Sequence, residues 1–169
     1  LIHIKDSELK VIPVALNEGE KKFVLDLKDY YGANQGSFND RELYLLRNLG
    51  RGHGVGFFQA HNFYPDFILW LVEGKKQRIT FIDPHGMRMA QGGFNDPKVQ
   101  FFQEIKTLEK QIGDTDVKLA SFIISVTPFE QIGLWDKKLT QKDFEDHHIV
   151  FQNDKSLYVS KIIKNALKE

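Results

Sequence analysis

Long, nearly unbroken apolar segments alternate with polar turns in the central part of the chain. Residues 63–72 form the longest segment, and a charged turn at 73–78 separates it from a second apolar run at 79–82. A third run occupies residues 119–126. Strands with continuous apolar character are typical of the middle of a sheet that is covered on both faces. The pattern therefore predicts three buried strands.

Apolar residues at helical spacing predict helices around these strands. Three leucines recur at three-residue intervals within residues 39–49, after Asn39 or Asp40 as a capping residue. A second helix is predicted to begin near Pro97, because proline suits the first turn of a helix. A third helix is predicted at residues 158–167, where apolar side chains again share one face.

Shorter segments complete the arrangement. Residues 11–16 and 22–27 are apolar and are separated by turn-forming residues, which predicts an N-terminal hairpin. Short strands are predicted at 55–60 and 148–151, and a short helix at 129–135. The resulting order of helix, three strands, helix and strand indicates a mixed α/β core. We therefore divide the chain into a hairpin extension, residues 1–37, and a core domain, residues 38–169.

The composition is that of one globular domain and excludes several classes of protein. The 169 residues are 41% hydrophobic, which suits a single core. The chain has no cysteine, which excludes disulfides, thiolate nucleophiles and cysteine-based zinc sites. No apolar run reaches the roughly 18 residues of a membrane span and no signal peptide is visible, so we expect a cytoplasmic protein without membrane contact. Because residue 1 is leucine, we expect the chain to be a piece of a longer protein.

Two aspartates occupy unusual positions in the apolar strands. Asp66 lies within the longest apolar run, and Asp83 ends the second. A buried carboxylate is unfavourable unless it is paired or holds a metal ion, and strands joined by a tight hairpin lie about 5 Å apart. Asp66 and Asp83 can therefore converge on one site, where oxygen ligands indicate magnesium or manganese. The alternative is that both are turn residues, beside Pro65 and Pro84, that hydrogen-bond their own backbone.

Other chemistries have little support in the sequence. The histidines do not have the spacing of a zinc site, and neither a phosphate-binding loop with its lysine nor a nucleophile elbow is present. The aromatic residues of the central segment are more typical of core packing than of base-stacking platforms. They are Phe57, Phe58, Phe63, Tyr64, Phe67 and Trp70.

The segment from Phe63 to Trp70, followed by Asp83-Pro84-His85, resembles the core motif of the PD-(D/E)XK nuclease superfamily. More narrowly, it is similar to the C-terminal nuclease-like domain of restriction-type DEAD/DEAH-box helicase proteins, the group that includes type III restriction subunits. Residues 42–48 resemble that family's preceding helix with its acidic residue, and residues 121–125 resemble its later strand. The resemblance covers about residues 38–160 and implies a restriction-endonuclease-like αβββαβ core.

The resemblance assigns roles to individual residues. It makes Asp66 and Asp83 the metal ligands, with the carbonyl of Pro84 as a further ligand and Glu42 nearby on the preceding helix. His85 stands at the position of the family's lysine, which orients the attacking water and stabilises the phosphate. A neutral histidine can hold a water or act as a base, but it is no permanent cation near pH 7.

These observations predict a DNA endonuclease that depends on magnesium or manganese and is tethered to a helicase in a restriction or defence system. The chain has 23 basic and 23 acidic residues, and this neutral balance fits a domain carried by a motor that already holds DNA. Basic residues predicted to contact backbone phosphates are Arg47, Arg51, Lys75, Lys76 and Arg78. The alternative, favoured by His85, is a catalytically weak nuclease-fold module for nucleic-acid binding or protein docking.

Overall fold

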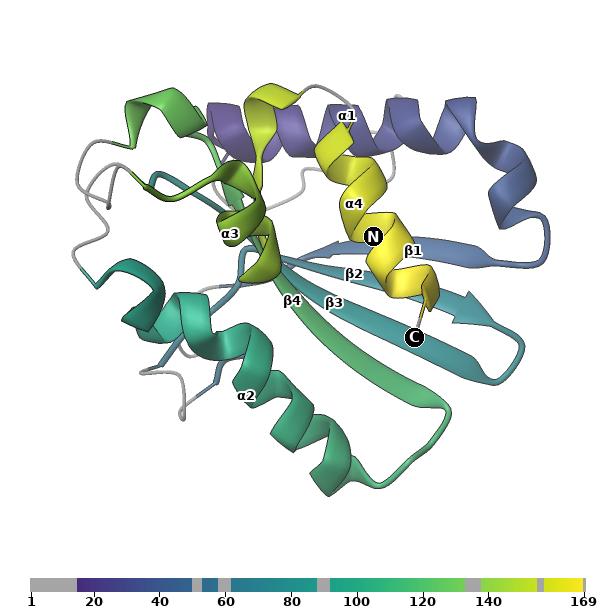
Figure 1. Cartoon of the computed structure of the whole chain (residues 1–169). Coiled ribbons are helices and arrows are strands. Elements are labelled where there is room, and N and C mark those ends of the chain that lie inside the picture. The colour runs from purple at the N-terminus through teal and green to yellow at the C-terminus, as the bar shows by residue number, and fades with distance from the viewer. Residues whose placement is uncertain are drawn as a thin grey trace.

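The computed structural model describes residues 15–49, 53–57, 62–87, 92–132, 138–154 and 157–168. These residues form an α/β fold in which a mixed five-stranded sheet lies between helices (Figure 1). The strands are β1 (Glu42–Arg47), β2 (Phe67–Glu73), β3 (Lys76–His85), β4 (Val117–Ser125) and β5 (Ile149–Phe151). The α-helices are α1 (Glu18–Ala33), α2 (Pro97–Ile112), α3 (Gln141–Asp146) and α4 (Leu157–Lys168).

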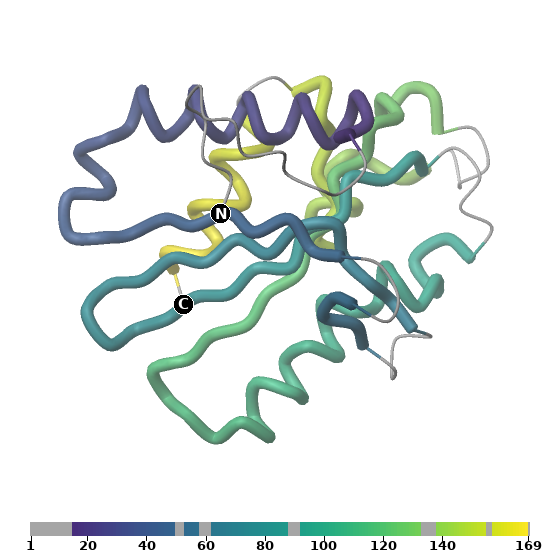
Figure 2. Tube along the Cα trace, turned by 180° about the vertical axis from the view of Figure 1, so that it is seen from behind, coloured from purple at the N-terminus to yellow at the C-terminus, as the bar shows by residue number. Residues whose placement is uncertain are grey.

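The sheet has the order β1-β2-β3-β4-β5. Strands β1, β2 and β3 are antiparallel neighbours, whereas β3, β4 and β5 are parallel. A parallel pair needs a crossover connection, and α2 supplies it between β3 and β4. Helices α1 and α4 lie on one side of the sheet and α2 lies on the other, as the views from both sides show (Figures 1 and 2).

Strand β2 is buried on both faces over most of its length. Phe67, Leu69 and Leu71 belong to a core cluster that includes residues of α1 and α4. Ile68 points to the opposite face and joins Phe81 in a cluster with residues of α2. This two-sided burial explains why the strand has no polar alternation, and it confirms the prediction of a central strand.

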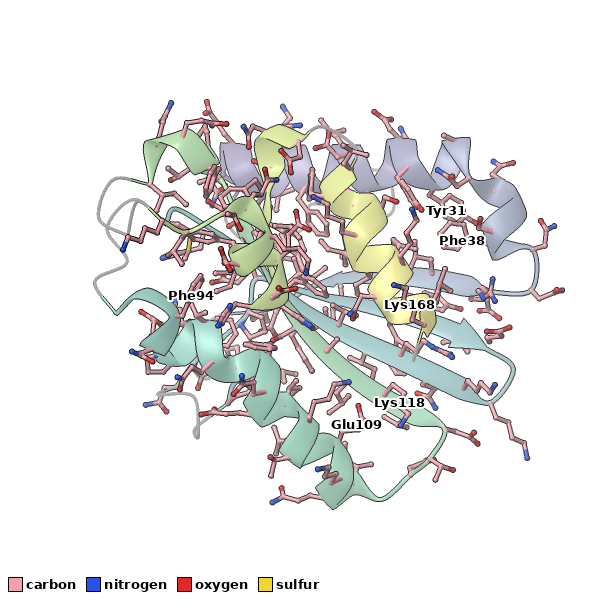
Figure 3. The ribbon with its side chains drawn as sticks, viewed as in Figure 1. Tyr31, Phe38, Phe94, Glu109, Lys118 and Lys168 are labelled. Atoms are coloured by element: carbon pink, nitrogen blue, oxygen red, sulfur yellow. The ribbon has the colours of Figure 1, made fainter. Side chains whose placement is uncertain are left out.

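Both ends of helix α2 have residues that typically begin or end a helix. The side chain of Asp96 accepts a hydrogen bond from the Lys98 backbone N–H, Pro97 stands in the first turn, and Gly113 ends the helix in the left-handed conformation. Near its C-terminal end, Glu109 lies beside Lys118 of β4 (Figure 3), with 3.2 Å between Oε1 and Nζ. The predictions of α2, β3, β4, β5, α4 and the charged turn between β2 and β3 are all confirmed.

The predicted N-terminal hairpin is wrong in its described part, because residues 18–33 form helix α1. Asn17 and Glu20 make a capping box, so the turn-like residues 17–20 are a helix N-terminus. Residues 11–14 of the predicted first strand lie outside the described residues. Helix α1 contributes Phe23 to the main core cluster.

The predicted helix at residues 39–49 is also wrong, because residues 42–47 form strand β1. Leu43 and Leu45 pack against the core cluster beneath α1, whereas Leu46 is exposed. Over such a short length, the leucines of this segment fit both the 3.6-residue period of a helix and the two-residue period of a strand. Hydrogen bonding to β2 makes the segment a strand. The order helix, three strands, helix, strand nevertheless holds, with α1 and β1 as its first two members.

The remaining differences concern short elements. In place of the predicted strand at 55–60, Phe57 forms an isolated bridge with Phe63, and residues 58–60 lie outside the described part of the chain. The predicted helix at 129–135 is a 3-10 turn at Phe129–Gln131, and residues 133–137 are not described. No helix within the described ranges has the length and apolar character needed to cross a bilayer.

Candidate active site

Asp66 and Asp83 lie next to each other at one end of the β2–β3 pair. The antiparallel register joins Phe67 to Ile82, and extending it by one residue sets Asp66 opposite Asp83. Directly opposite residues point to the same face with Cβ atoms about 5 Å apart. The prediction that the two carboxylates converge is therefore confirmed by the strand pairing.

The two carboxyl groups interact directly and are poorly solvated. Asp83 is 5% exposed, and its Oδ2 has no hydrogen-bond partner among the described residues. Burial, the charge of Asp83 and a hydrogen bond to it raise the pKa of Asp66 to about 7. Burial also raises the pKa of Asp83. The pair therefore retains a proton up to neutral pH, because two close carboxylates in a poorly solvated place do not both ionise.

Lys98 approaches this pair from the first turn of α2. Its Nζ lies 3.7 Å from Oδ2 of Asp83, which is an ion-pair distance but too long for a hydrogen bond. The same ammonium lies 5.5 Å from the centre of the Phe63 ring. Since the cap at Asp96 sets where α2 begins, it also sets where Lys98 stands.

His85 is two residues beyond Asp83 on β3 and so points to the same face. Burial and then the charge of Lys98 lower the pKa of the His85 imidazole, against the opposing charges of Asp66 and Asp96. The ring is therefore neutral at pH 7, where it can accept a proton or hold a water.

The N-terminus of α1 brings a further carboxylate to this end of the sheet. Glu20 is 7% exposed, and its Oε2 accepts a hydrogen bond of 3.0 Å from Nη2 of Arg47 on β1. The charge of Glu20 adds to burial in raising the pKa of Asp83, and the charge of Arg47 opposes the rise at Asp66. Neither Glu20 nor Lys98 was predicted as a site residue, because each is far from the motif in sequence.

Other predicted residues lie away from the pair. Glu42 is exposed on β1, five residues before Arg47, and so about 17 Å along the strand from the carboxylates. Lys75, Lys76 and Arg78 lie toward the β2–β3 turn, at the opposite end of these strands. Pro84 is buried directly after Asp83. Arg51 lies outside the described residues.

Comparison of the chain with protein-family models, with curated proteins and with solved structures found no match. Within the described ranges, no group of three or more Asp, Glu, His or Cys side chains is arranged to hold a metal ion. Among the described residues, two carboxyl groups, one imidazole and one ammonium thus gather at this end of the sheet.

The raised pKa of Asp66 makes a prediction about stability and pH. Folding raises this pKa from 3.8 to about 7, so the folded state binds the extra proton between these values and stability falls as pH rises through them. Asp66→Asn should therefore stabilise the chain by about 1–2 kcal/mol near pH 8, allowing for solvent screening, and by almost nothing near pH 4. Urea unfolding at both pH values measures this difference.

The exposed Asp29 of α1 provides a matched control for this prediction. Asp29→Asn should change stability by a similar small amount at both pH values, since surface substitutions have effects within about 0.5 kcal/mol. An equal effect of Asp66→Asn at the two pH values would show that its carboxyl titrates normally.

Proposed function

We propose that this chain is a metal-dependent endonuclease domain of the PD-(D/E)XK type, which hydrolyses phosphodiester bonds in DNA. The observation that carries the proposal is the buried Oδ2 of Asp83, which lacks a hydrogen-bond partner among the described residues and faces a second carboxyl with a raised pKa. Its nearest positive charge is the ammonium of Lys98, at the ion-pair distance of 3.7 Å, and two buried carboxyl groups beside a single ammonium leave room for a further cation. The pair is costly for the fold alone, which favours a functional reason for it.

The donor set fits magnesium or manganese. These ions prefer oxygen ligands, and magnesium usually keeps several waters and takes only one or two carboxylates from the protein together with substrate phosphate. Asp66 and Asp83 would supply the carboxylates, and the carbonyl of Pro84 would supply a third oxygen. Once bound, the ion would lower the pKa of a water and neutralise charge on the scissile phosphate.

The neighbouring side chains divide the remaining work. Lys98 provides a permanent positive charge within 3.7 Å of Asp83, and such a charge stabilises a phosphate that becomes more negative during the reaction. The neutral ring of His85 can hold the attacking water and accept its proton. Lys98 would thus supply the cation that His85 cannot supply at its own position.

The order of elements supports the same proposal. Helix α1, strands β1 to β3, helix α2 and strand β4 follow the αβββαβ order that the resemblance implies. The acidic residue of the first helix would be Glu20, in place of the predicted Glu42. A tethered helicase would bring the DNA, since the chain itself has no net charge.

A catalytically weak module on the same fold is the second candidate function. It is favoured by His85, which stands where the nuclease family has a lysine. Because the pKa of His85 is lowered, this position carries no positive charge at neutral pH. In this alternative the domain would bind nucleic acid or dock a protein in a restriction or defence system without cutting DNA.

Metal binding and cleavage test the proposal directly. Magnesium or manganese should raise the melting temperature, because an ion that binds only the folded state stabilises it by about 2.7 kcal/mol at 100 times its Kd. Asp83→Asn should remove this response and abolish plasmid nicking, whereas Asp29→Asn should retain both. A metal response without nicking in the parent chain would favour the weak module, and a full metal response in Asp83→Asn would place the ion elsewhere.

A further inference from the structure

One face of the sheet is left partly uncovered at β1 and β2. Trp70 is 40% exposed and Tyr44 is 42% exposed, and the two residues are directly opposite each other in the antiparallel register. Leu46, on the same side of β1, is 48% exposed. Helix α2 packs against β4, on the far side of β3, and so does not cover this part of the face. We call Tyr44, Leu46 and Trp70 the aromatic platform.

The prediction that Trp70 is a core residue is wrong, because its side chain is exposed. Its neighbours Leu69 and Leu71 are buried on the opposite face, so the alternation of β2 turns the indole outward. Apolar side chains grouped on an open surface are typical of an interaction site. The hydroxyl of Tyr44 donates a hydrogen bond to Glu42, which holds the phenol ring in place.

The platform and the candidate active site share one face of the sheet, with the buried Ile68 between Trp70 and Asp66. The side chain of Asp83 lies on the face of the sheet that α2 covers, because Lys98 of α2 contacts its carboxylate. Ile68 packs against α2 on this same face, and Trp70, two residues further along β2, also points to it. Leu46 of the platform directly precedes Arg47, whose charge acts on Asp66. A strand rises about 3.4 Å per residue, so Trp70 lies about 14 Å from Asp66 along β2.

Two lysines lie at the end of the platform far from the carboxylates, and a groove runs beside the platform along strand β1. Lys75 and Lys76 are exposed at the turn between β2 and β3, where Glu73 is already paired with Arg41 at 3.2 Å. A groove of about 770 Å³ along β1 is lined by the three platform residues together with Lys28 and other residues of α1, β1 and β2. Across β1, β2 and β3, the carboxylates thus lie at one end, the aromatic rings between the ends and the lysines at the other end.

We propose that this surface binds single-stranded nucleic acid, with unpaired bases stacked on Trp70 and Tyr44 while the backbone passes Asp66 and Asp83. Proteins bind single strands by combining aromatic stacking with positive charge along the backbone. A duplex keeps its bases stacked inside and cannot use exposed rings in this way. The inference rests on the proposed function for the direction of the strand toward the carboxylates, and it specifies the substrate as an unpaired strand.

Tryptophan fluorescence tests the platform without cleavage. The chain has two tryptophans, so Trp135→Phe leaves Trp70 as the only reporter. With EDTA present, oligothymidylate should quench Trp70 emission by stacking, and a duplex of the same length should bind at least tenfold more weakly. Equal binding of the duplex, or no quenching by the single strand, would overturn the proposal.

Substitutions that keep an apolar side chain but remove the aromatic ring separate stacking from folding. Trp70→Leu and Tyr44→Leu should each weaken binding of labelled oligothymidylate about tenfold, measured by fluorescence anisotropy. Ile112→Ala, which changes an exposed apolar residue at the end of α2, should not. Unchanged affinity in both leucine variants would assign the face to a protein partner. Because EDTA removes metal, failure of single-strand binding can be told apart from failure of the metal-dependent cleavage.

Discussion

Replacement of Lys98 by glutamine is expected to lower metal-dependent DNA cleavage by about 100-fold to 1,000-fold. Lys98 is the permanent cation that the structure brings to within 3.7 Å of Asp83, and glutamine keeps much of its length without its charge. The same substitution should leave magnesium affinity unchanged or raise it, because it removes a positive charge that competes for the carboxylates. Single-turnover nicking and calorimetric titration with magnesium measure the two effects.

The contrast between Lys98 and His85 decides which residue supplies the charge. His85→Ala should lower cleavage less than Lys98→Gln does, since the imidazole is neutral, and His85→Lys should retain or increase cleavage. Lys110→Gln, an exposed position on the same helix, should have no effect. A larger loss in His85→Ala than in Lys98→Gln would assign the main role to the histidine.

Phe101→Ala is expected to destabilise the chain by about 3–5 kcal/mol, the range for removal of a buried aromatic side chain. Phe101 is 1% exposed, and its ring centre lies 4.4 Å from that of Phe57, 5.3 Å from that of Phe63 and 6.4 Å from that of Phe81. It therefore joins α2 to the sheet and to the loop before β2. Denaturant unfolding of the parent and the variant measures the loss.

This packing also positions Lys98, because both residues belong to α2. Cleavage by Phe101→Ala should accordingly fall further than the folded fraction does, whereas Phe101→Leu should lose less stability. Ile112→Ala, at the exposed end of the same helix, should change stability by less than about 0.5 kcal/mol. A loss below about 1 kcal/mol in Phe101→Ala would contradict the anchoring role.

Local sequence determined the β2–β3 hairpin and with it the carboxylate pair. The turn at Gly74-Lys75 joins two largely apolar strands, and the register of such a hairpin is set by the turn and the residues next to it. Asp66 and Asp83 therefore become neighbours without any help from distant parts of the chain. The start of α2 is equally local, because Asp96 and Pro97 form its cap and first turn.

Local sequence was insufficient where an element depends on its partner. Residues 42–47 have leucines that suit a helix or a strand, and hydrogen bonding to β2 made them a strand. Glu20 stands in a segment that reads as a turn, and the capping box that it forms with Asn17 makes that segment a helix start. For this reason Glu20, and not the predicted Glu42, is the glutamate at this end of the sheet.

The central strands, the start of α2 and the paired carboxylates follow from local sequence, because each depends on neighbours within a few residues or across one tight turn. The approach of Lys98 to the pair, and of Glu20 to the same end of the sheet, depends on the packing of α2 and α1, which are distant in sequence from the two aspartates. The exposure of Trp70 was likewise decided by packing: its apolar strand is buried where helices cover it and open where α2 does not reach. Which part of the sheet a helix leaves uncovered cannot be predicted from composition, because it depends on how the helices pack on the sheet.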